Sequence, residues 1–161
     1  MDAEQRKDEH AATDDEDEPM SYTTIDDLLH GYADAVVHRD PDQWISTWAT
    51  DAVWELGKGR RVEGADAILA LWNSAMDGFK AVVQNVVNHT ADLDEAAGTG
   101  SGRCYINEYW CRAGDVRGIT LAYYDDLYVR SDAGWQFASR ELVVQYGGPP
   151  DLSGPFLNAW S

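Results

Sequence analysis

The spacing of apolar residues changes once along the chain, from a helical period to a strand period. In residues 23–40 the apolar positions follow alternating steps of three and one, which is typical of a helix with one buried face. Residues 65–76 repeat this spacing, with Trp72 on the buried side. From residue 82 onward apolar and polar residues alternate, as they do in strands with one buried face. The pattern therefore indicates helices packed against one face of a sheet.

Between the two helical segments, residues 23–40 and 65–76, the sequence predicts a short helix and a hairpin. Asp40 and Pro41 form an N-cap and N1 pair that opens a second helix. A short strand at 52–56 and a glycine-bearing turn at 57–59 follow. Long strands are then expected at 82–93, 102–112, 116–130 and 134–146. We therefore expect an α+β fold in which three N-terminal helices pack on a curved antiparallel sheet and enclose a pocket.

The length and charge of the chain limit its organisation and its partners. A length of 161 residues suits one domain. We expect residues 1–20, which carry a net charge of −7, to form a disordered acidic tail. Residues 21–147 then form the domain and residues 148–161 an irregular C-terminal tail. The chain has 29 acidic and 12 basic residues, a formal net charge of −17, which argues against nucleic acid and membrane surfaces as partners.

Neither a signal peptide nor an apolar run of about 18 residues is present, so we expect a cytoplasmic protein. Cys104 and Cys111 lie seven residues apart in one predicted strand, on opposite faces, and are not expected to form a disulfide. The chain has no Cys/His spacing typical of a metal site. We therefore expect neither a metal nor a cofactor.

His89 and Glu108 are the candidate proton-transfer residues. His89 shares a predicted strand face with Val87, Ala91 and Leu93, and an imidazole with a pKa near about 6.5 is suited to moving protons at neutral pH. A core histidine bonded to backbone is the alternative. Glu108 faces the same pocket if its strand face is the inner one; otherwise Asn107 is the polar group of the pocket.

Aromatic residues are the candidate pocket walls. Tyr32 lies at the centre of the first helical stripe and is a candidate donor to a substrate oxygen. On the sheet, either Tyr124 or its neighbour Tyr123 faces inward. Trp54, Trp72 and Phe137 are the remaining expected walls. Asp126 and Arg140 lie opposite or one step apart across a predicted hairpin, which favours a structural ion pair.

Four segments carry a resemblance to a known family: YADAVVHRDPDQWISTWATDAVWEL, VEGADAILALW, VVNHTADLDEAAGTGSGRCYINEY and TLAYYDDLYVRSDAGWQFASRE. From about Tyr22 to Tyr146 the chain resembles the SnoaL-like branch of the nuclear transport factor 2-like superfamily. This group includes polyketide cyclases, scytalone dehydratase, hexachlorocyclohexane dehydrochlorinase and bile-acid dehydratase. The resemblance implies a cone-shaped α+β fold and a homodimer formed through the outer face of the sheet.

The resemblance also bears on the candidate residues. It implies that His89 is the catalytic base, that Glu108 lies at or beside a second acid–base position, and that Tyr32 is a pocket donor. The sequence departs from the family at one point. The aspartate that orients the histidine in those enzymes is replaced here by Val37, and Asp34 lies on the solvated face of the helix.

The sequence therefore predicts a cofactor-independent lyase or isomerase. Its ligand is expected to be a small, neutral, apolar molecule containing a ring, such as a polyketide or steroid-like compound. In this prediction His89 abstracts a proton, Tyr32 or Tyr124 stabilises the developing oxyanion, and Glu108 orients or relays. Two alternatives are a non-catalytic small-molecule-binding domain, favoured by the missing aspartate, and a structural small subunit of a ring-hydroxylating dioxygenase.

Overall fold

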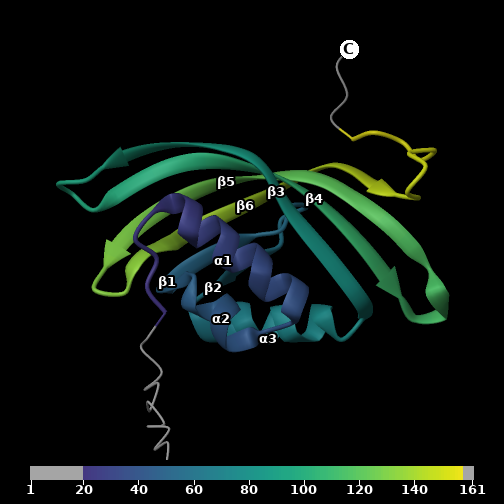
Figure 1. Ribbon diagram of the computed structural model, residues 1–161, viewed down its shortest axis with the longest axis horizontal. Coiled ribbons are helices and arrows are strands. Elements are labelled where there is room, and N and C mark those ends of the chain that lie inside the picture. Colours follow the sequence, from purple (N-terminus) through teal and green to yellow (C-terminus); the bar gives the residue numbers. More distant parts are fainter. Residues whose placement is uncertain (1–19, 158–161) are drawn as a thin grey trace, which may run out of the picture.

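The computed structural model describes residues 20–157, which form an α+β fold (Figure 1). The helices in this range are α1 (Ile25–His38), α2 (Pro41–Ser46) and α3 (Ala65–Met76), with a 3₁₀ turn at Ala113–Asp115. The strands are β1 (Trp48–Glu55), β2 (Arg61–Glu63), β3 (Phe79–Asp94), β4 (Thr99–Arg112), β5 (Arg117–Ser131) and β6 (Gly134–Gly148). The second helix ends at Ser46, and Trp48 begins β1.

Side chains cap the starts of α1 and α2, and the cap of α2 is the predicted one. Thr24 and Asp27 form a reciprocal capping box, in which each side chain accepts a hydrogen bond from the backbone N–H of the other. The carboxylate of Asp40 accepts from the N–H groups of Asp42 and Gln43, and Pro41 occupies the first turn. These caps satisfy N–H groups that have no partner within the helix, and they fix where α1 and α2 begin.

The six strands form one sheet in the order β2-β1-β6-β5-β4-β3. The strands from β3 to β6 pair as antiparallel hairpins, as predicted. The expectation of a wholly antiparallel sheet is wrong, because β1 pairs with β6 in parallel. A hairpin forces two strands to run in opposite directions, but β1 and β6 are joined through α3 and three long strands, so their relative direction is not constrained in that way.

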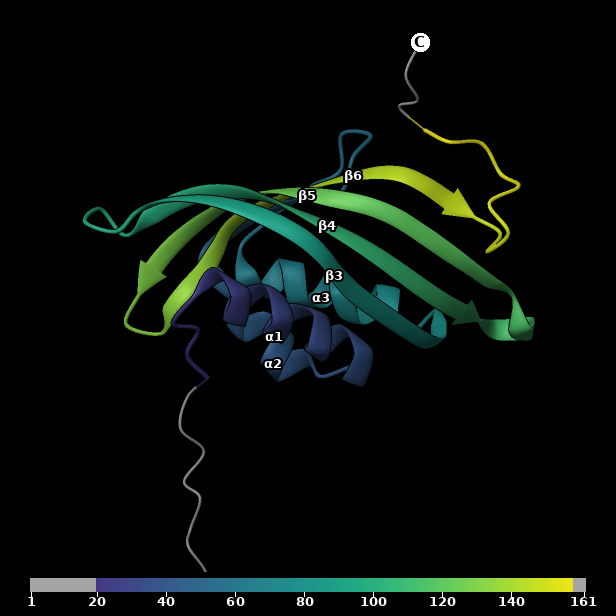
Figure 2. The same ribbon diagram turned by 45° about the horizontal axis from the view of Figure 1, so that its top comes forward.

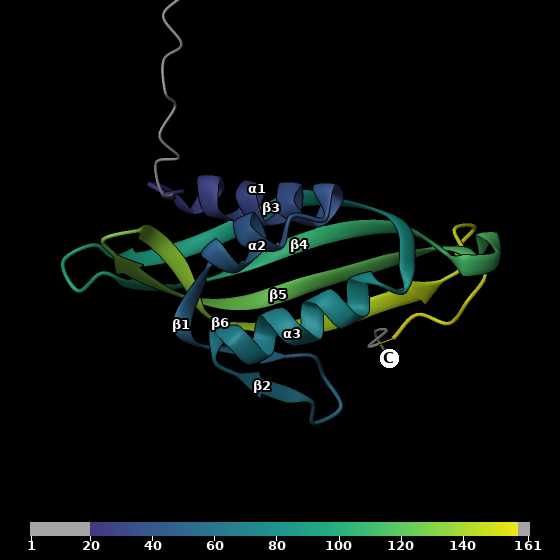
Figure 3. The same cartoon turned by 90° about the horizontal axis from the view of Figure 1, so that it is seen from below.

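The sheet arches over the helices, which lie against its concave face (Figures 1 and 2). Seen from below, α1 runs along the β3 and β4 side while α3 lies toward β6 (Figure 3). Aromatic residues fill the space between the layers: the indole of Trp44 is fully buried and stacks on Trp72 with ring centroids 4.7 Å apart. This burial of apolar area is the main force holding helices and sheet together.

The C-terminal segment that follows β6 turns back on the sheet. The Phe156 ring packs on Tyr146 with centroids 5.0 Å apart. Residues 158–161 and the acidic stretch 1–19 lie outside the described residues. Within residues 20–157 the longest helix is α1, and no helix has the length and apolar character needed to span a bilayer.

Candidate functional site

A cavity of about 150 Å³ lies between the helices and the concave face of the sheet. Its apolar wall comes from both layers and includes Val36, Trp54, Trp72, Met76, Phe79 and Ile106. Its polar groups come from Tyr32 on α1, Gln84 on β3, Glu108 on β4, and Thr120 and Tyr124 on β5. An apolar enclosure with a few convergent polar groups is the usual form of a small-molecule site.

Glu108 is the carboxyl group of this cavity. Its Oε2 accepts a hydrogen bond of 2.9 Å from the side-chain amide of Gln84. Burial raises the pKa of Glu108, whereas the hydrogen bond from Gln84 and the positive charge of Arg112 oppose that shift. A carboxyl group whose pKa is raised toward neutrality is suited to accept and return a proton.

Tyr32 and Tyr124 bring two phenol hydroxyls together at the cavity wall. Their oxygens are 3.5 Å apart, and both side chains are almost fully buried. Burial raises the pKa of both phenols, so they remain protonated at neutral pH. Only one of the two hydroxyl hydrogens can lie between the oxygens, so the second is available for donation to a ligand.

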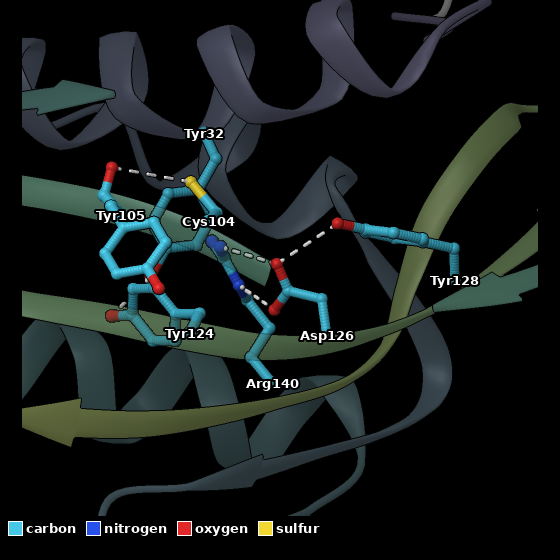
Figure 4. A network of polar contacts seen from close by, with 7 residues as sticks. All are labelled: Tyr32, Cys104, Tyr105, Tyr124, Asp126, Tyr128 and Arg140. Atoms are coloured by element: carbon cyan, nitrogen blue, oxygen red, sulfur yellow. Dashed lines mark hydrogen bonds and ion pairs between the residues drawn. The ribbon is translucent and has the colours of Figure 1, made fainter. Parts of the chain in front are cut away.

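The predicted pair of Asp126 and Arg140 is confirmed, and it lies beneath the two tyrosines (Figure 4). The strand register places the two residues directly opposite each other. The Arg140 Nε and Nη2 atoms donate to the two Asp126 carboxylate oxygens at 2.8 and 3.0 Å, and the Tyr128 hydroxyl donates to Asp126 at 3.3 Å. Both charged side chains are buried, with relative exposures of 1% for Arg140 and 2% for Asp126.

His89 does not line the cavity, contrary to expectation. It is paired with Cys104 across β3 and β4, on the inner side of the sheet, and its Nε2 lies 3.4 Å from the Asp26 carboxylate in the first turn of α1. A bulge between Val86 and Asn88 breaks the strict alternation of β3, and the predicted inner residue Val87 is 56% exposed as a result. The strand positions that reach the cavity, Gln84 among them, lie before this bulge.

The structure separates the remaining candidates into two groups. Trp54, Trp72 and Tyr124 line the cavity with Tyr32 and Glu108. Asn107 and Phe137 do not. Because neighbours on a strand face opposite sides and Ile106 and Glu108 line the cavity, Asn107 faces the outer side, and the alternative that it is the polar group of the pocket is wrong. Tyr123 likewise faces outward, where its ring contacts Tyr105.

Phe137 is a core residue with no exposed surface, and it packs against Trp48 and the guanidinium of Arg140. Sequence reasoning missed Gln84 and Thr120. Gln84 carries a usable signal, because it stands between Val82 and Val86 on the buried side of β3. A polar residue in a buried row requires a partner, and here that partner is Glu108.

The other polar residues of α1 lie outside the site. Asp34 is exposed, as predicted, and His30 and His38 are exposed as well. Asp34 accepts from the side-chain amide of Gln43 at 3.0 Å, and Val37 is 40% exposed. Within residues 20–157 no group of three or more His, Cys, Asp or Glu side chains is arranged to hold a metal ion.

The family model of the SnoaL-like domain matches residues 18–141, which is most of the chain. The chain belongs to the SnoaL-like family. Comparison with curated protein sequences finds no match. The SnoaL-like domain thus spans the helices, the first half of β6 and every residue that lines the cavity except Leu142.

Solved structures of other proteins have the same fold as this chain. A scytalone dehydratase-like protein from Novosphingobium aromaticivorans has a TM-score of 0.71 at 18% identity, covering 76% of this chain and 83% of that one. A hexachlorocyclohexane dehydrochlorinase from Novosphingobium barchaimii has a TM-score of 0.70 at 21% identity, covering 84% and 92%. A protein from Xanthomonas campestris that resembles a calcium/calmodulin-dependent kinase II association domain has a TM-score of 0.64 at 12% identity, covering 74% and 84%. At these identities the likeness establishes the fold alone, and the same fold serves different functions.

Proposed function

We propose that this SnoaL-like protein is a cofactor-independent lyase or isomerase in which Glu108 transfers a proton and the hydroxyls of Tyr32 and Tyr124 hold a substrate oxygen. The observation that carries this proposal is that all three residues line one cavity between the helices and the sheet. A carboxyl group with a raised pKa and a pair of protonated phenols supply the two functions that proton abstraction beside a carbonyl needs. The structural relatives named as dehydratase and dehydrochlorinase are consistent with elimination chemistry.

The cavity size supports a substrate with a single ring. Its volume of about 150 Å³ matches that of apolar protein cavities that hold benzene. A fused steroid or polycyclic polyketide needs several times this volume, so we narrow the expected substrate class to neutral monocyclic ketones and their hydroxylated relatives. Substrates that are uncharged in solution are favoured because the chain has a net charge of −17, whereas the negative charge of an enolate develops only after the substrate is bound.

The chemistry follows from the arrangement of these groups. In its ionised form Glu108 removes a proton from the carbon beside the carbonyl; the C–H bond breaks, its electron pair forms a C=C bond, and the π electron pair of the C=O bond moves onto the oxygen. Tyr32 and Tyr124 stabilise the resulting enolate through hydrogen bonds. In an elimination the enolate expels a leaving group from the next carbon, whereas in an isomerisation Glu108 returns the proton to a different carbon. Gln84 holds the Glu108 carboxylate in position.

Exchange of hydrogen for deuterium at the α-carbons of cyclohexanone tests the proton-transfer step directly. In D₂O, followed by NMR, the native protein should accelerate this exchange. Glu108→Gln should reduce the acceleration by about 10²- to 10⁴-fold, the usual contribution of a general base. His89→Ala should retain it, because His89 lies outside the cavity. Loss of exchange in His89→Ala together with full exchange in Glu108→Gln would restore the histidine as the base and overturn the proposal.

A non-catalytic binding domain is the second candidate. It is favoured by the position of His89, which pairs with Asp26 rather than with any group in the cavity. In this case cyclohexanone binds in a calorimetric titration, while its deuterium exchange stays at the rate measured without protein. The two measurements together decide between the enzyme and the binding domain.

We also propose a homodimer formed through the outer face of the sheet. Val83 and Tyr109 are paired across β3 and β4 on this face and are 46% and 45% exposed, and Leu127 on β5 is 53% exposed. Exposed apolar side chains on one sheet face favour a protein contact. Sedimentation velocity should give a dimer for the native chain and a monomer for Tyr109→Lys; a monomeric native chain would rule the interface out.

A further inference from the structure

Arg140 is surrounded by aromatic rings on the inner side of the sheet. Its guanidinium carbon lies 3.9 Å from the ring centroid of Tyr124, 4.4 Å from that of Tyr32 and 3.9 Å from that of Phe137. Figure 4 shows the guanidinium between the Asp126 carboxylate and the two tyrosine rings. A buried cation therefore lies directly against the rings of two tyrosines that line the cavity.

Stability alone is a weak reason to keep this pair. Removing two charges from water costs several kcal/mol per ion, and replacement of such a pair by apolar residues is often neutral or stabilising. The surroundings of Arg140 are aromatic and would accept an apolar side chain. The position of the cation against the cavity wall suggests a role in binding.

The charge acts on the hydroxyls through a region with little water. A positive charge beside a phenol makes its O–H group a stronger hydrogen-bond donor, and it attracts negative charge that develops on a ligand oxygen. Asp126 holds the guanidinium through two parallel hydrogen bonds, so its orientation is fixed before a ligand enters.

The other ionisable groups around Tyr32 and Tyr124 do not cancel the effect of the Arg140 charge on their hydroxyls. Burial raises the pKa of the Cys104 thiol on β4 to about 11, so this thiol is neutral at pH 7. Burial also raises the pKa of Tyr128 on β5, which therefore stays protonated. Glu108 on β4 opposes an anion only in its ionised form, and protonated Glu108 is the form present after it has removed a proton. The negative charge of Asp126 lies on the far side of Arg140 from the tyrosine rings.

We propose that Arg140, held by Asp126, is a positioning residue that strengthens Tyr32 and Tyr124 as donors, so that this site prefers an enolate or phenolate oxygen over its neutral form. The inference rests on the proposed function for its substrate class, monocyclic ketones and their hydroxylated relatives. The preference for the ionised oxygen then depends on the Asp126–Arg140 ion pair as well as on the hydroxyls of Tyr32 and Tyr124.

The probe for this proposal is 4-nitrophenol, which has one ring and whose ionised form has a distinct visible absorption. The pKa of the bound probe, read from its spectrum across pH, should fall below that of the free probe in the full-length native protein. The paired substitution Asp126→Leu with Arg140→Met removes both charges without leaving one buried alone. It should reduce the preference for the ionised probe at least tenfold, as should Tyr124→Phe.

Arg140→Lys serves as the matched control, because it keeps the charge but loses the bidentate geometry, and it should retain part of the preference. Tyr124→Phe and Arg140→Lys also decide the question if the paired variant does not fold. Absence of probe binding, or an unchanged preference in both the paired variant and Tyr124→Phe, would overturn the inference. Glu108→Gln separates this inference from the proposed function: it should reduce deuterium exchange by about 10²- to 10⁴-fold, whereas the pKa of the bound probe should still lie below that of the free probe.

Discussion

The ionisation of Glu108 should make the stability of the folded protein depend on pH. Burial raises its pKa in the folded state above the ordinary value of 4.5, so between these two values the folded state binds more protons than the unfolded state. Stability therefore falls as pH rises through this window. In Glu108→Gln this loss is absent, so the melting temperature of the variant relative to the native protein should increase from pH 4 to pH 7.

The control for this measurement is Glu141→Gln, because Glu141 is exposed on β6. Its melting temperature relative to the native protein should change little with pH. If the difference between Glu108→Gln and the native protein is the same at pH 4 and pH 7, Glu108 is not ionising against burial, and its assignment as the proton-transfer group loses its physical basis.

Replacing Asp126 alone should destabilise the protein more than replacing Asp126 and Arg140 together. Asp126→Asn leaves the Arg140 charge buried without its carboxylate and should reduce the free energy of unfolding by about 3–5 kcal/mol. The paired Asp126→Leu and Arg140→Met substitution leaves no unpaired charge and should recover most of that loss. Urea denaturation measures all three proteins; a paired variant that is less stable than Asp126→Asn would contradict this account.

At the scale of elements, Gly134 connects the N-terminus of the fold to the start of β6. It adopts a positive φ of 84°, and a Cβ atom there would lie 2.3 Å from the backbone oxygen of Tyr22. Gly59 in the β1–β2 turn has a similar φ of 76° but no atom within 4 Å of its Cβ position. Gly59→Ala should therefore cost only the backbone strain, about 1–2 kcal/mol.

Gly134→Ala should cost about 1–3 kcal/mol more than Gly59→Ala, because the methyl group must also displace the backbone of Tyr22. Chemical denaturation of the two variants side by side isolates this steric contribution. Equal losses would mean that the bridge between Tyr22 and Gly134 does not constrain the fold.

The strand β3 shows where a sequence pattern stops being sufficient. Alternation placed His89 on the inner side of the sheet correctly, but it placed Val87 on the same side, and Val87 is 56% exposed. One extra residue at a bulge changes the phase of every position after it. Alternation also gives no measure of distance along the strand, so it could not distinguish a cavity position such as Gln84 from one under the first turn of α1.

At the scale of the whole molecule, the enclosed volume should select ligands by size. Phenol fits a cavity of about 150 Å³ and, at a concentration one hundred times its dissociation constant, should stabilise the protein by about 2.7 kcal/mol. Cholesterol should leave the melting temperature unchanged, and 1-naphthol should have a smaller effect than phenol. Leu142→Ala enlarges the cavity and should narrow the gap between naphthol and phenol. Stabilisation by cholesterol equal to that by phenol would show that the cavity is not the binding site.

The sequence by itself determined the order of elements, the helix caps and the family, because hydrophobic period and capping residues act over a few neighbouring positions. It also predicted that Asp126 and Arg140 lie opposite or one step apart, since counting from a tight hairpin limits the register. A register shift between Leu127 and Tyr128 then places them directly opposite each other. Only the tertiary structure decided which residues form the site. Gln84, Glu108 and Tyr124 come from three different strands, and Tyr32 comes from a helix. Their meeting in one cavity, with His89 outside it, depends on sheet curvature, a bulge and the position of the helices, all of which are set by packing across the whole molecule.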